Sequence, residues 1–582
     1  RGLGDVYKRQ YVNYTKTFAK KHNLNVMAGV NAEEEEYKYL YGTRNVMYDQ
    51  EGYPELNMAG KDGQDLSWNH TSRASAGYFG RINYDYKGIY LLELNGRYDG
   101  SSRFPHTDQW AFFPSASIGY RFSEEAYFAP LKHIVSNGKL RASFGEIGNE
   151  AVGDYMFEQL ISQRLNNKST GYIYWIENNN ANANLLTMYN MPDLVSSTLT
   201  WERIRTLNIG LDLGLLNDEL TIGFDWFQRE NRDMLAPAQV LPNTLGASAP
   251  YENAGTLRTR GWELNLNWRH TFGDFDVYAN FNIGDSKTKV TKWDNDSKLL
   301  STYYTGKTYG DIFGFETDRY FEEKDFTSQN ADGSWNYANG IASQAGLESG
   351  NFHYGPGDVK FKDLDGNGKI DGGKGTADDH GDLKVIGNSM PRYEYSFHLG
   401  GAWKGIDLDL YFQGVGKRED WTTSSLNLPA MVHADVAIYS HQTSYNKVLW
   451  NSDYTAITGY EVNQGNRYPR LYRGTNNSGG TVSGIANGCN NYYPQSRYLT
   501  DMSYLRLKNV TVGYTLPKEW TRKAYIEKAR IYFSGSNLFL LHKGNDLPVD
   551  PEISTGNGLT AGGWGRIAPI TRTFSFGVQV TL

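Results

Sequence analysis

An acidic loop in the second half of the chain has the spacing of a calcium-binding segment. From Asp363 to Asp371 the sequence reads DLDGNGKID, so oxygen-bearing side chains recur at alternate positions around a glycine turn. In an EF-hand loop these positions coordinate Ca²⁺, and the twelfth position is a bidentate Glu. Here the twelfth position is Lys374. Two interpretations stay open, a Ca²⁺-like site or a tight loop held by Asx turns. The metal ligands of the first would be Asp363, Asp365, Asn367, Lys369 and Asp371.

Two long segments rich in aromatic and amide side chains are candidates for molecular recognition. They run from Met156 to Thr200 and from Trp421 to Tyr498. Aromatic rings stack on sugars or fill a protein interface with a large contact area at modest entropic cost. We expect these segments to contact a substrate or a partner, and packing within the loops is the alternative. The candidate residues are Tyr172, Tyr174, Trp175, Trp450, Tyr454, Tyr492 and Tyr493.

No catalytic motif accompanies these candidates. HExxH, CxxC, GxSxG and GxxxxGK[ST] strings are absent, and the 11 His are scattered. The single cysteine, Cys489, allows no internal disulfide. With a net charge of −7 and dispersed basic residues, a nucleic-acid surface has little support. The sequence therefore predicts no enzyme, no catalytic residue and no required cofactor. A glycan hydrolase, which would need two carboxylates facing one cleft, is kept as the alternative.

Amphipathic strands must position these segments. The last twelve residues alternate strictly, with Phe574, Phe576 and Val578 on one face and polar side chains on the other. The same alternation recurs upstream, where the polar faces carry charged residues such as Arg81, Glu93 and Asp212. A wet lumen accepts such charges, whereas a packed sandwich core does not. An array of extracellular sandwiches with its charged face in solvent is the alternative.

The fold class predicted is all-β, a transmembrane antiparallel β-barrel. No apolar run approaches the roughly 18–20 residues of a membrane helix. We expect about fifteen or sixteen strands of about 10–15 residues, joined alternately by tight turns and by long extracellular loops. With 63 Gly, 43 Tyr and 14% aromatics, the composition also suits a barrel. The expected lipid-facing residues are Tyr78, Leu92, Leu211, Phe224, Trp226, Phe281 and Phe576.

Eight sequence blocks in series resemble SusC/RagA-type TonB-dependent outer-membrane transporters. Their order and spacing fit nearly the whole chain after residue 10. The final residue departs from the pattern, because Leu582 stands where many barrels end in an aromatic. The blocks are RYDGSSRF (97–104), WxxFPSAS (110–117), LRASFGEIGN (140–149), WERIRTLNIGLDLGLL (201–216), NAGTLRTRGWEL (253–264), GDVKFKDLDGNGKID (357–371), YLRLKNVTVGYTLP (504–517) and NLFLLHKGNDLPVDPEI (537–553).

The resemblance implies import of a large nutrient through the outer membrane of a Gram-negative bacterium. The substrate would be an oligosaccharide or a peptide. A SusD-like surface lipoprotein would cover the extracellular loops, and TonB–ExbB–ExbD would supply energy through an N-terminal part. The implied barrel has about 22 strands around a plug, of which this chain would hold about the last 16. A porin without a plug is a further alternative.

The resemblance also bears on the start of the chain and on one charged strand end. Residues 1–10 include DVYKRQ, which resembles a translated sequencing adapter, so we expect residues 11–582 to be the partial receptor barrel. No signal peptide opens the sequence. Arg97, Asp99 and Arg103 are expected to form a lumenal charge ladder that contacts the plug, with substrate binding as the alternative.

Overall fold

The computed structural model of the chain is built almost entirely of β-strands. It describes residues 2–44, 59, 64–159, 161, 163–165, 187–189, 192, 194–196, 199–237, 249–349, 352–422, 426–429, 439–471, 490–552 and 570–582. Among these residues the only α-helix is the short α1 (Lys518–Thr521). No described helix is long and apolar enough to cross a membrane.

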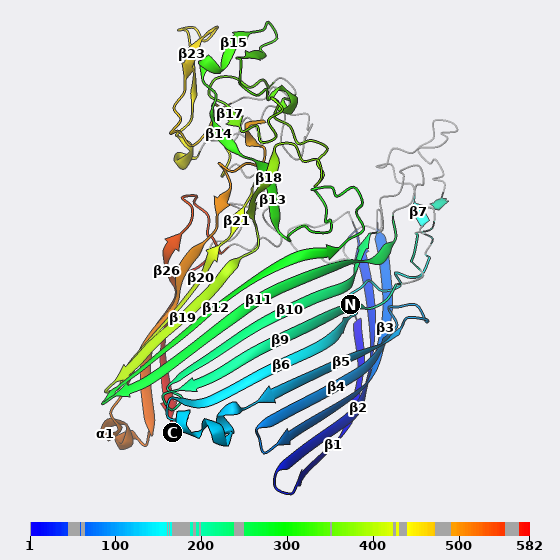
Figure 1. Ribbon diagram of the computed structural model, residues 1–582, viewed down its shortest axis with the longest axis vertical. Helices are drawn as coiled ribbons and strands as arrows, with labels where there is room; N and C mark the ends of the chain where they lie inside the picture. Colours follow the sequence, from blue (N-terminus) through cyan, green and yellow to red (C-terminus); the bar gives the residue numbers. More distant parts are fainter. Residues whose placement is uncertain are drawn as a thin grey trace.

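Fifteen strands of the described chain form one antiparallel sheet in which the strands lie in chain order. This up-and-down order is that of a barrel wall, and Figure 1 shows the sheet curving around a hollow. The strand number agrees with the fifteen or sixteen predicted. The strands are β1 (Gly2–Phe18), β2 (His22–Thr43), β3 (Asp65–Tyr86), β4 (Tyr90–Ser101), β5 (Trp110–Tyr120), β6 (Val135–Asn149), β9 (Glu202–Leu215), β10 (Leu220–Pro237), β11 (Tyr251–Phe272), β12 (Phe275–Lys292), β19 (Arg392–Trp403), β20 (Ile406–Lys417), β25 (Tyr504–Thr515), β26 (Lys528–Lys543) and β27 (Thr573–Thr581).

The strand register sorts apolar and charged side chains onto opposite faces. Leu211 lies beside Phe224, Trp226 beside Trp262, and Phe281 beside Phe397. On the other face Glu263 lies beside Asp225. Because side chains alternate with a period of two, this pairing extends along each regular strand. The structure therefore confirms the alternation of apolar and polar faces that the sequence predicts. We call the apolar face outer and the charged face inner.

Tight turns close the sheet at one end, which we call the turn end. Lys87 and Gly88 connect β3 to β4 with φ of 56° and 67°, and Lys404 and Gly405 connect β19 to β20 with φ of 46° and 92°. Two successive residues with positive φ are the requirement of the hairpin turn that matches strand twist. The sequence marks both turns by Lys-Gly after an alternating run.

Several strands are longer than the 10–15 residues expected. β2, β3 and β11 each contain 22 residues. At about 3.3 Å per residue such a strand extends roughly 73 Å, far more than a tilted crossing of a bilayer core about 30 Å thick requires. These strands therefore continue beyond the lipid at the opposite end, which we call the loop end.

Two long segments at the loop end fold together into a lobe of their own. We call the described residues within 293–391 and 418–503 the loop lobe, and Figure 1 shows it above one end of the sheet. Its core is aromatic and includes Tyr320, Phe321, Phe352 and Tyr354, which are fully buried. The sequence predicted only long loops here. The short strands of the lobe are β13 (Asp311–Phe315), β14 (Thr317–Tyr320), β15 (Phe326–Gln329), β16 (Trp335–Tyr337), β17 (Val359–Phe361), β18 (Leu383–Asn388), β21 (Glu419–Asp420), β22 (Lys447–Trp450), β23 (Ile457–Glu461) and β24 (Thr500–Asp501).

A further hairpin lies outside the lobe and consists of β7 (Gln163–Leu165) and β8 (Thr187–Tyr189).

Aromatic side chains mark two levels of the sheet. Near the turn end Tyr90 stacks on Tyr120 with ring centroids 5.3 Å apart. Toward the loop end Tyr98 stacks on Trp110 at 5.1 Å. Aromatic girdles of this kind flank the apolar band of a membrane barrel.

The register predicts which positions meet lipid. In a Cys489→Ser background, cysteines at Leu92 and Leu211 should react with a maleimide confined to the lipid phase. Cysteines at the neighbouring Glu93 and Asp212 should react only with a water-soluble maleimide, because they lie on the inner face. Labelling yield by mass spectrometry is the measurement. The reverse pattern would contradict the assignment of the two faces.

Candidate functional site on the inner wall and the loop lobe

A charged cluster occupies the middle of the inner wall. Arg141 on β6 donates to Asp212 on β9 (Nε to Oδ2, 2.9 Å) and to Asp225 on β10 (Nη1 to Oδ1, 2.7 Å). One guanidinium thus joins two carboxylates from neighbouring strands, and its side chain is 32% exposed. Arg suits this position because its planar fork binds two carboxylates at once. The cluster keeps water-accessible charge on the wall without leaving the carboxylates unpaired.

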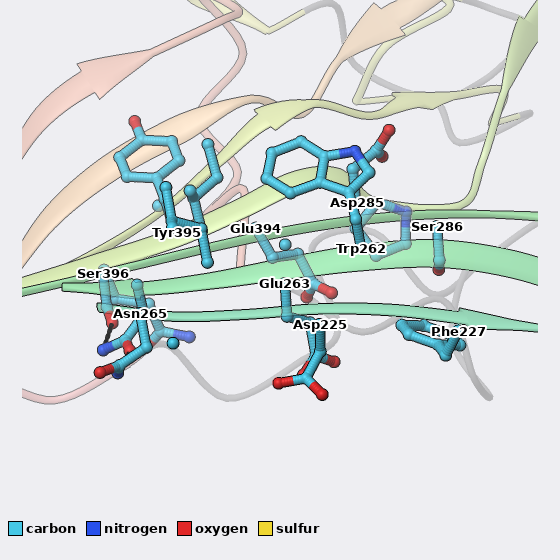
Figure 2. Close-up of a pocket in the computed structure, with 18 of the residues that line it drawn as sticks. Asp225, Phe227, Trp262, Glu263, Asn265, Asp285, Ser286, Glu394, Tyr395 and Ser396 are labelled. Carbon is cyan, nitrogen blue, oxygen red and sulfur yellow. Dashed lines mark hydrogen bonds between the residues drawn. The ribbon is translucent and has the colours of Figure 1, made fainter. Parts of the chain in front are cut away.

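Beside this cluster the inner wall is hollowed by a concavity of about 580 Å³. Its lining includes Asp225, Glu263 and Asn265. In Figure 2 these three side chains point to one side of the strands, whereas Trp262 and Tyr395 point to the other. The concavity therefore presents carboxylate and amide groups to the interior.

A row of asparagines continues the inner wall. Asn265 of β11 donates to Asn282 of β12, and Asn280 donates to Asn267. Asn282 also donates to Asn280 at 2.6 Å. Uncharged amides offer both donors and acceptors, which suits hydroxyl groups. The sequence prediction missed this row, although the N-x-N pattern at 265–267 and 280–282 repeats on strands that pair.

A tyrosine ladder stands on the inner face of β2 near the loop end. Tyr37 stacks on Tyr39 (centroids 6.5 Å apart, planes at 7°), and Tyr39 stacks on Tyr41 (6.3 Å, 14°). The opposite face carries Lys38 and Leu40. Alternation on a regular strand places the three rings in one line. The signal in the sequence is YKYLY, which the prediction did not use.

Of the three residues in the predicted charge ladder, Arg97 and Asp99 contact each other, whereas Arg103 has a different partner. Arg97 donates to both carboxylate oxygens of Asp99 at 2.9 and 2.7 Å, and to Asn31 at 3.2 Å. Arg103 instead binds Asp154 at 2.8 Å, in the segment that follows β6. The contact of this ladder with a plug stays a prediction.

A buried ion pair joins the two segments of the loop lobe. The carboxylate of Asp358 is fully buried and accepts hydrogen bonds from Arg470 (Nε, 2.8 Å; Nη2, 2.7 Å). It also accepts the Gly355 backbone N–H at 2.8 Å and the Asn491 amide at 2.8 Å. Four donors satisfy the carboxylate, which makes its burial tolerable. Arg470 and Asn491 lie in the second segment, so this contact fastens one long loop to the other.

Other lobe carboxylates have displaced pKa values. Hydrogen bonds from Lys362 and Lys384 lower the pKa of Glu316 to about 2. Burial raises the pKa of Asp325, but hydrogen bonds from Arg319 outweigh it, so that pKa lies below its usual value. Burial raises the pKa of Asp420 to about 6. The first two groups hold the lobe through ion pairs at neutral pH.

The aromatic candidates fall into three groups. Tyr492 and Tyr493 are 4% and 8% exposed and belong to the lobe core, as the alternative of packing within the loops expects. Their rings are therefore used for packing, which argues against their stacking on a ligand. Trp450 and Tyr454 are 47% and 79% exposed on the β22–β23 hairpin. Their contact with a substrate or partner stays a prediction. The remaining three, Tyr172, Tyr174 and Trp175, lie outside the described residues.

The acidic loop is held by backbone hydrogen bonds of the Asx type. Asp363 accepts the N–H groups of Gly366 (2.7 Å) and Gly368 (2.9 Å), and Asp365 and Asn367 accept those of the residues two further on. Carboxylate oxygens of Asp363, Asp365 and Asp382 lie within 4.8 Å of one another. Asp382 was absent from the predicted ligands, because it follows eleven residues after Asp371. Of the other predicted ligands, Asp371 accepts the Gly373 N–H at 2.8 Å, and Lys369 donates its backbone N–H to Asn367. The Ca²⁺-like site stays a prediction.

Comparison with known proteins identifies the architecture. The family model described as "TonB dependent receptor-like, beta-barrel" matches residues 2–378. The chain is 27% identical to TonB-dependent receptor P3 of Formosa agariphila, over 100% of this chain and 52% of that protein. It is 24% identical to TonB-dependent receptor SusC of Bacteroides thetaiotaomicron, over 94% of this chain and 47% of that protein. The chain thus spans about half the length of the curated relatives it matches.

A solved structure has the same fold. The RagAB peptide transporter superposes with a TM-score of 0.70 at 18% identity, covering 99% of this chain and 56% of the matched chain. At that identity the likeness concerns the fold. Together with the strand order, it confirms the antiparallel barrel that the sequence predicts.

Proposed function

Because the chain belongs to the TonB-dependent receptor-like β-barrel family, we propose that it forms barrel wall and loop lobe of a transporter that imports a large nutrient, most simply an oligosaccharide. The family places the protein in the outer membrane, and its members are transporters and not enzymes. The glycan hydrolase alternative is thereby set aside. The SusC/RagA type follows from the same relatives, one named SusC and one structure titled RagAB.

The tyrosine ladder is the observation that supports a glycan as the transported substrate. Three aromatic rings with nearly parallel planes stand in sequence along the inner wall, with centroids 6.3–6.5 Å apart. Sugar rings have apolar faces that stack on aromatic side chains while their hydroxyls stay hydrogen-bonded. The asparagine row offers neutral donors and acceptors further along the same wall. A peptide, the cargo named for RagAB, remains the second candidate, because the carboxylates around the concavity suit charged peptide groups.

We also propose the partners that the relatives suggest. A SusD-like surface lipoprotein would dock on the loop lobe, where the β22–β23 hairpin exposes Trp450 and Tyr454. Such exposed aromatic side chains are common anchors of protein interfaces. Energy coupling through TonB–ExbB–ExbD is proposed from the family alone, and no described residue is assigned to it.

Replacing Tyr37, Tyr39 and Tyr41 together by alanine should reduce oligosaccharide uptake. If each ring contributes about 0.5–1.5 kcal/mol, the apparent affinity falls by roughly ten- to a thousandfold. Uptake of labelled oligosaccharide by cells that carry the full receptor is the measurement. The matched control replaces Lys38 and Leu40 on the opposite face, and Tyr→Phe at the three positions should keep uptake. Unchanged uptake after the triple alanine replacement would rule out the ladder, and uptake of peptide alone would favour the second candidate.

A further inference from the structure

The part of β3 nearest the loop end has a free edge in the described part of the chain. β3 pairs with β2 along its whole length, from Asp65 to Tyr86, but with β4 only from Ser75 onward. Residues 65–74 therefore have a described strand on one side only, and they form a two-stranded ribbon with β2 that continues past the end of β4. A strand edge of this kind presents unpaired backbone groups to any chain that can lie alongside.

The hydrogen bonds at the lower end of this edge show which backbone groups point away from β2. Ala74 donates its N–H to the Ser102 hydroxyl and accepts the Ser102 N–H, both at 2.9 Å. Ser72 donates its N–H to the Tyr155 hydroxyl and accepts the same hydroxyl, both at 3.1 Å. Every second residue of a regular strand points its N–H and C=O to the same side. The backbone groups of residues 66, 68 and 70 therefore point the same way, and no described residue hydrogen-bonds to them. We call these backbone groups the open edge.

Apolar side chains line the outer face of the ribbon along the open edge. Leu66 and Trp68 are 71% and 60% exposed, and Leu40, which pairs with Trp68, is 59% exposed. Tyr78 lies in the girdle at the loop end, where its ring stacks on Trp110. Leu66 is twelve residues further along β3, roughly 40 Å of strand and about 30 Å in height at a tilt near 40°. Lipid does not reach this level, so these side chains meet water, and apolar side chains gathered in water mark an interaction surface.

The ribbon is acidic, and a concavity lies at its lower end. Residues 31–44 and 64–75 contain five acidic residues and three Lys or Arg. The concavity has a volume of about 490 Å³ and is lined by Gly100 and Ser102 at the end of β4. Its charged lining residues are Lys8, Glu33 and Glu34, and neither glutamate forms an ion pair with another described residue. The excess of negative charge favours a partner that carries basic side chains.

We propose that the open edge binds an extended, basic segment of another protein at the cell surface, which adds to β3 as an antiparallel strand. Paired N–H and C=O groups that recur at every second residue are the pattern that an extended polypeptide matches. Apolar side chains at alternate positions of this segment lie beside Leu66 and Trp68. A basic side chain at its end reaches Glu34 in the concavity. Backbone pairing, apolar contact and charge thus select the same kind of partner.

A second copy of this chain does not fit the open edge. β4 pairs with the lower part of the same edge of β3, so the open part faces the space above the β4–β5 connection of the same barrel. Two copies upright in one membrane also present identical edges that run in the same direction, and these cannot pair as antiparallel strands. The partner is therefore a different protein. This docking is independent of what the receptor transports, because the tyrosine ladder lies on the other face of the ribbon.

The test uses the full receptor purified from outer membranes in detergent. The probe is a short fluorescent peptide in which valine and threonine alternate, with a lysine at each end. One comparison peptide carries methyl groups on alternate backbone nitrogens, which removes N–H donors, and another has glutamate in place of lysine. One receptor variant combines Leu66→Ser with Trp68→Ser. A second, His70→Pro, removes one N–H of the open edge and leaves the backbone bonds to β2 in place. The control combines Leu299→Ser with Val385→Ser, which are exposed apolar residues of the loop lobe. Heat-modifiable mobility on gels verifies the fold of each variant.

We expect the methylated peptide to bind at least about tenfold more weakly, since each hydrogen bond contributes roughly two- to tenfold. The double serine variant should also bind the probe at least about tenfold more weakly, because each half-buried large apolar side chain contributes roughly three- to tenfold. His70→Pro should weaken binding by about two- to tenfold, and the glutamate peptide should bind more weakly than the lysine peptide. The control should bind as the unaltered receptor does. Hydrogen exchange should find the amides of residues 66, 68 and 70 unprotected in the free receptor and protected with the probe.

Equal binding of the methylated and unmethylated peptides would overturn the proposal, and so would equal binding by the double serine variant and the unaltered receptor. Protection of the three amides in the free receptor would show that this chain covers its own edge, which also overturns it. Self-association of the receptor that His70→Pro abolishes would identify a second copy as the occupant and overturn the choice of a different protein.

Discussion

Replacing Arg470 with methionine destabilises the loop lobe by about 3–5 kcal/mol. The change leaves the Asp358 carboxylate fully buried with only the Gly355 N–H and the Asn491 amide as donors. An uncompensated buried charge of this kind is among the most costly single changes. Because Arg470 belongs to the second long loop, the lobe should separate into its two segments. The barrel strands should keep their pairing.

Hydrogen exchange measured on the full receptor tests this prediction. Protection should be lost across β14, β17 and the lobe core but retained in β9 to β12. If a lipoprotein docks on the lobe, its co-purification should also be lost. The matched control is Lys447→Met, which breaks the exposed Lys447–Glu461 pair at 3.4 Å and should cost at most about 1 kcal/mol. Unchanged protection of the lobe in the Arg470 variant would show that the ion pair does not hold the two loops together.

A polypeptide of residues 1–582 expressed by itself should aggregate and should not transport. β1 and β27 each have a single neighbour in the described sheet, so each leaves a row of backbone N–H and C=O groups unpaired. Lipid offers these groups no hydrogen-bond partner, at a cost of several kcal/mol for each group. Open edges also pair with other chains. We therefore expect sedimenting material and no heat-modifiable band on gels.

The edge itself can be tested within the same polypeptide. Val12→Lys places a charge on β1, and lysine on an edge strand disfavours pairing between chains. The matched change, Val30→Lys, lies on the same face of β2, which has neighbours on both sides. Val12→Lys should slow aggregation more than Val30→Lys does, measured by light scattering after dilution from denaturant. A folded, heat-modifiable barrel from the unaltered polypeptide would contradict the account.

Part of this architecture could be read from the residues alone. The alternation of Phe224, Trp226 and Leu211 with Asp212 and Asp225 determined which side chains share a face, because a strand repeats every two residues. Lys-Gly after an alternating run determined the tight turns. The acidic loop kept its local Asx pattern in the structure, since those hydrogen bonds link residues two to five apart. All of these are local properties of the chain.

The tertiary structure decided everything that depends on which distant segments meet. Asp358 and Arg470 are 112 residues apart, and their contact follows only from the packing of two loops. For the same reason the sequence could not decide whether Tyr492 and Tyr493 contact a ligand or pack within the loops, and the structure places both in the lobe core. The charged cluster of the inner wall draws its members from three strands, and only their register brings Arg141 within reach of both Asp212 and Asp225. Alternation determines the face of each side chain, but register between strands determines its neighbours, and hydrogen bonding across the sheet sets that register.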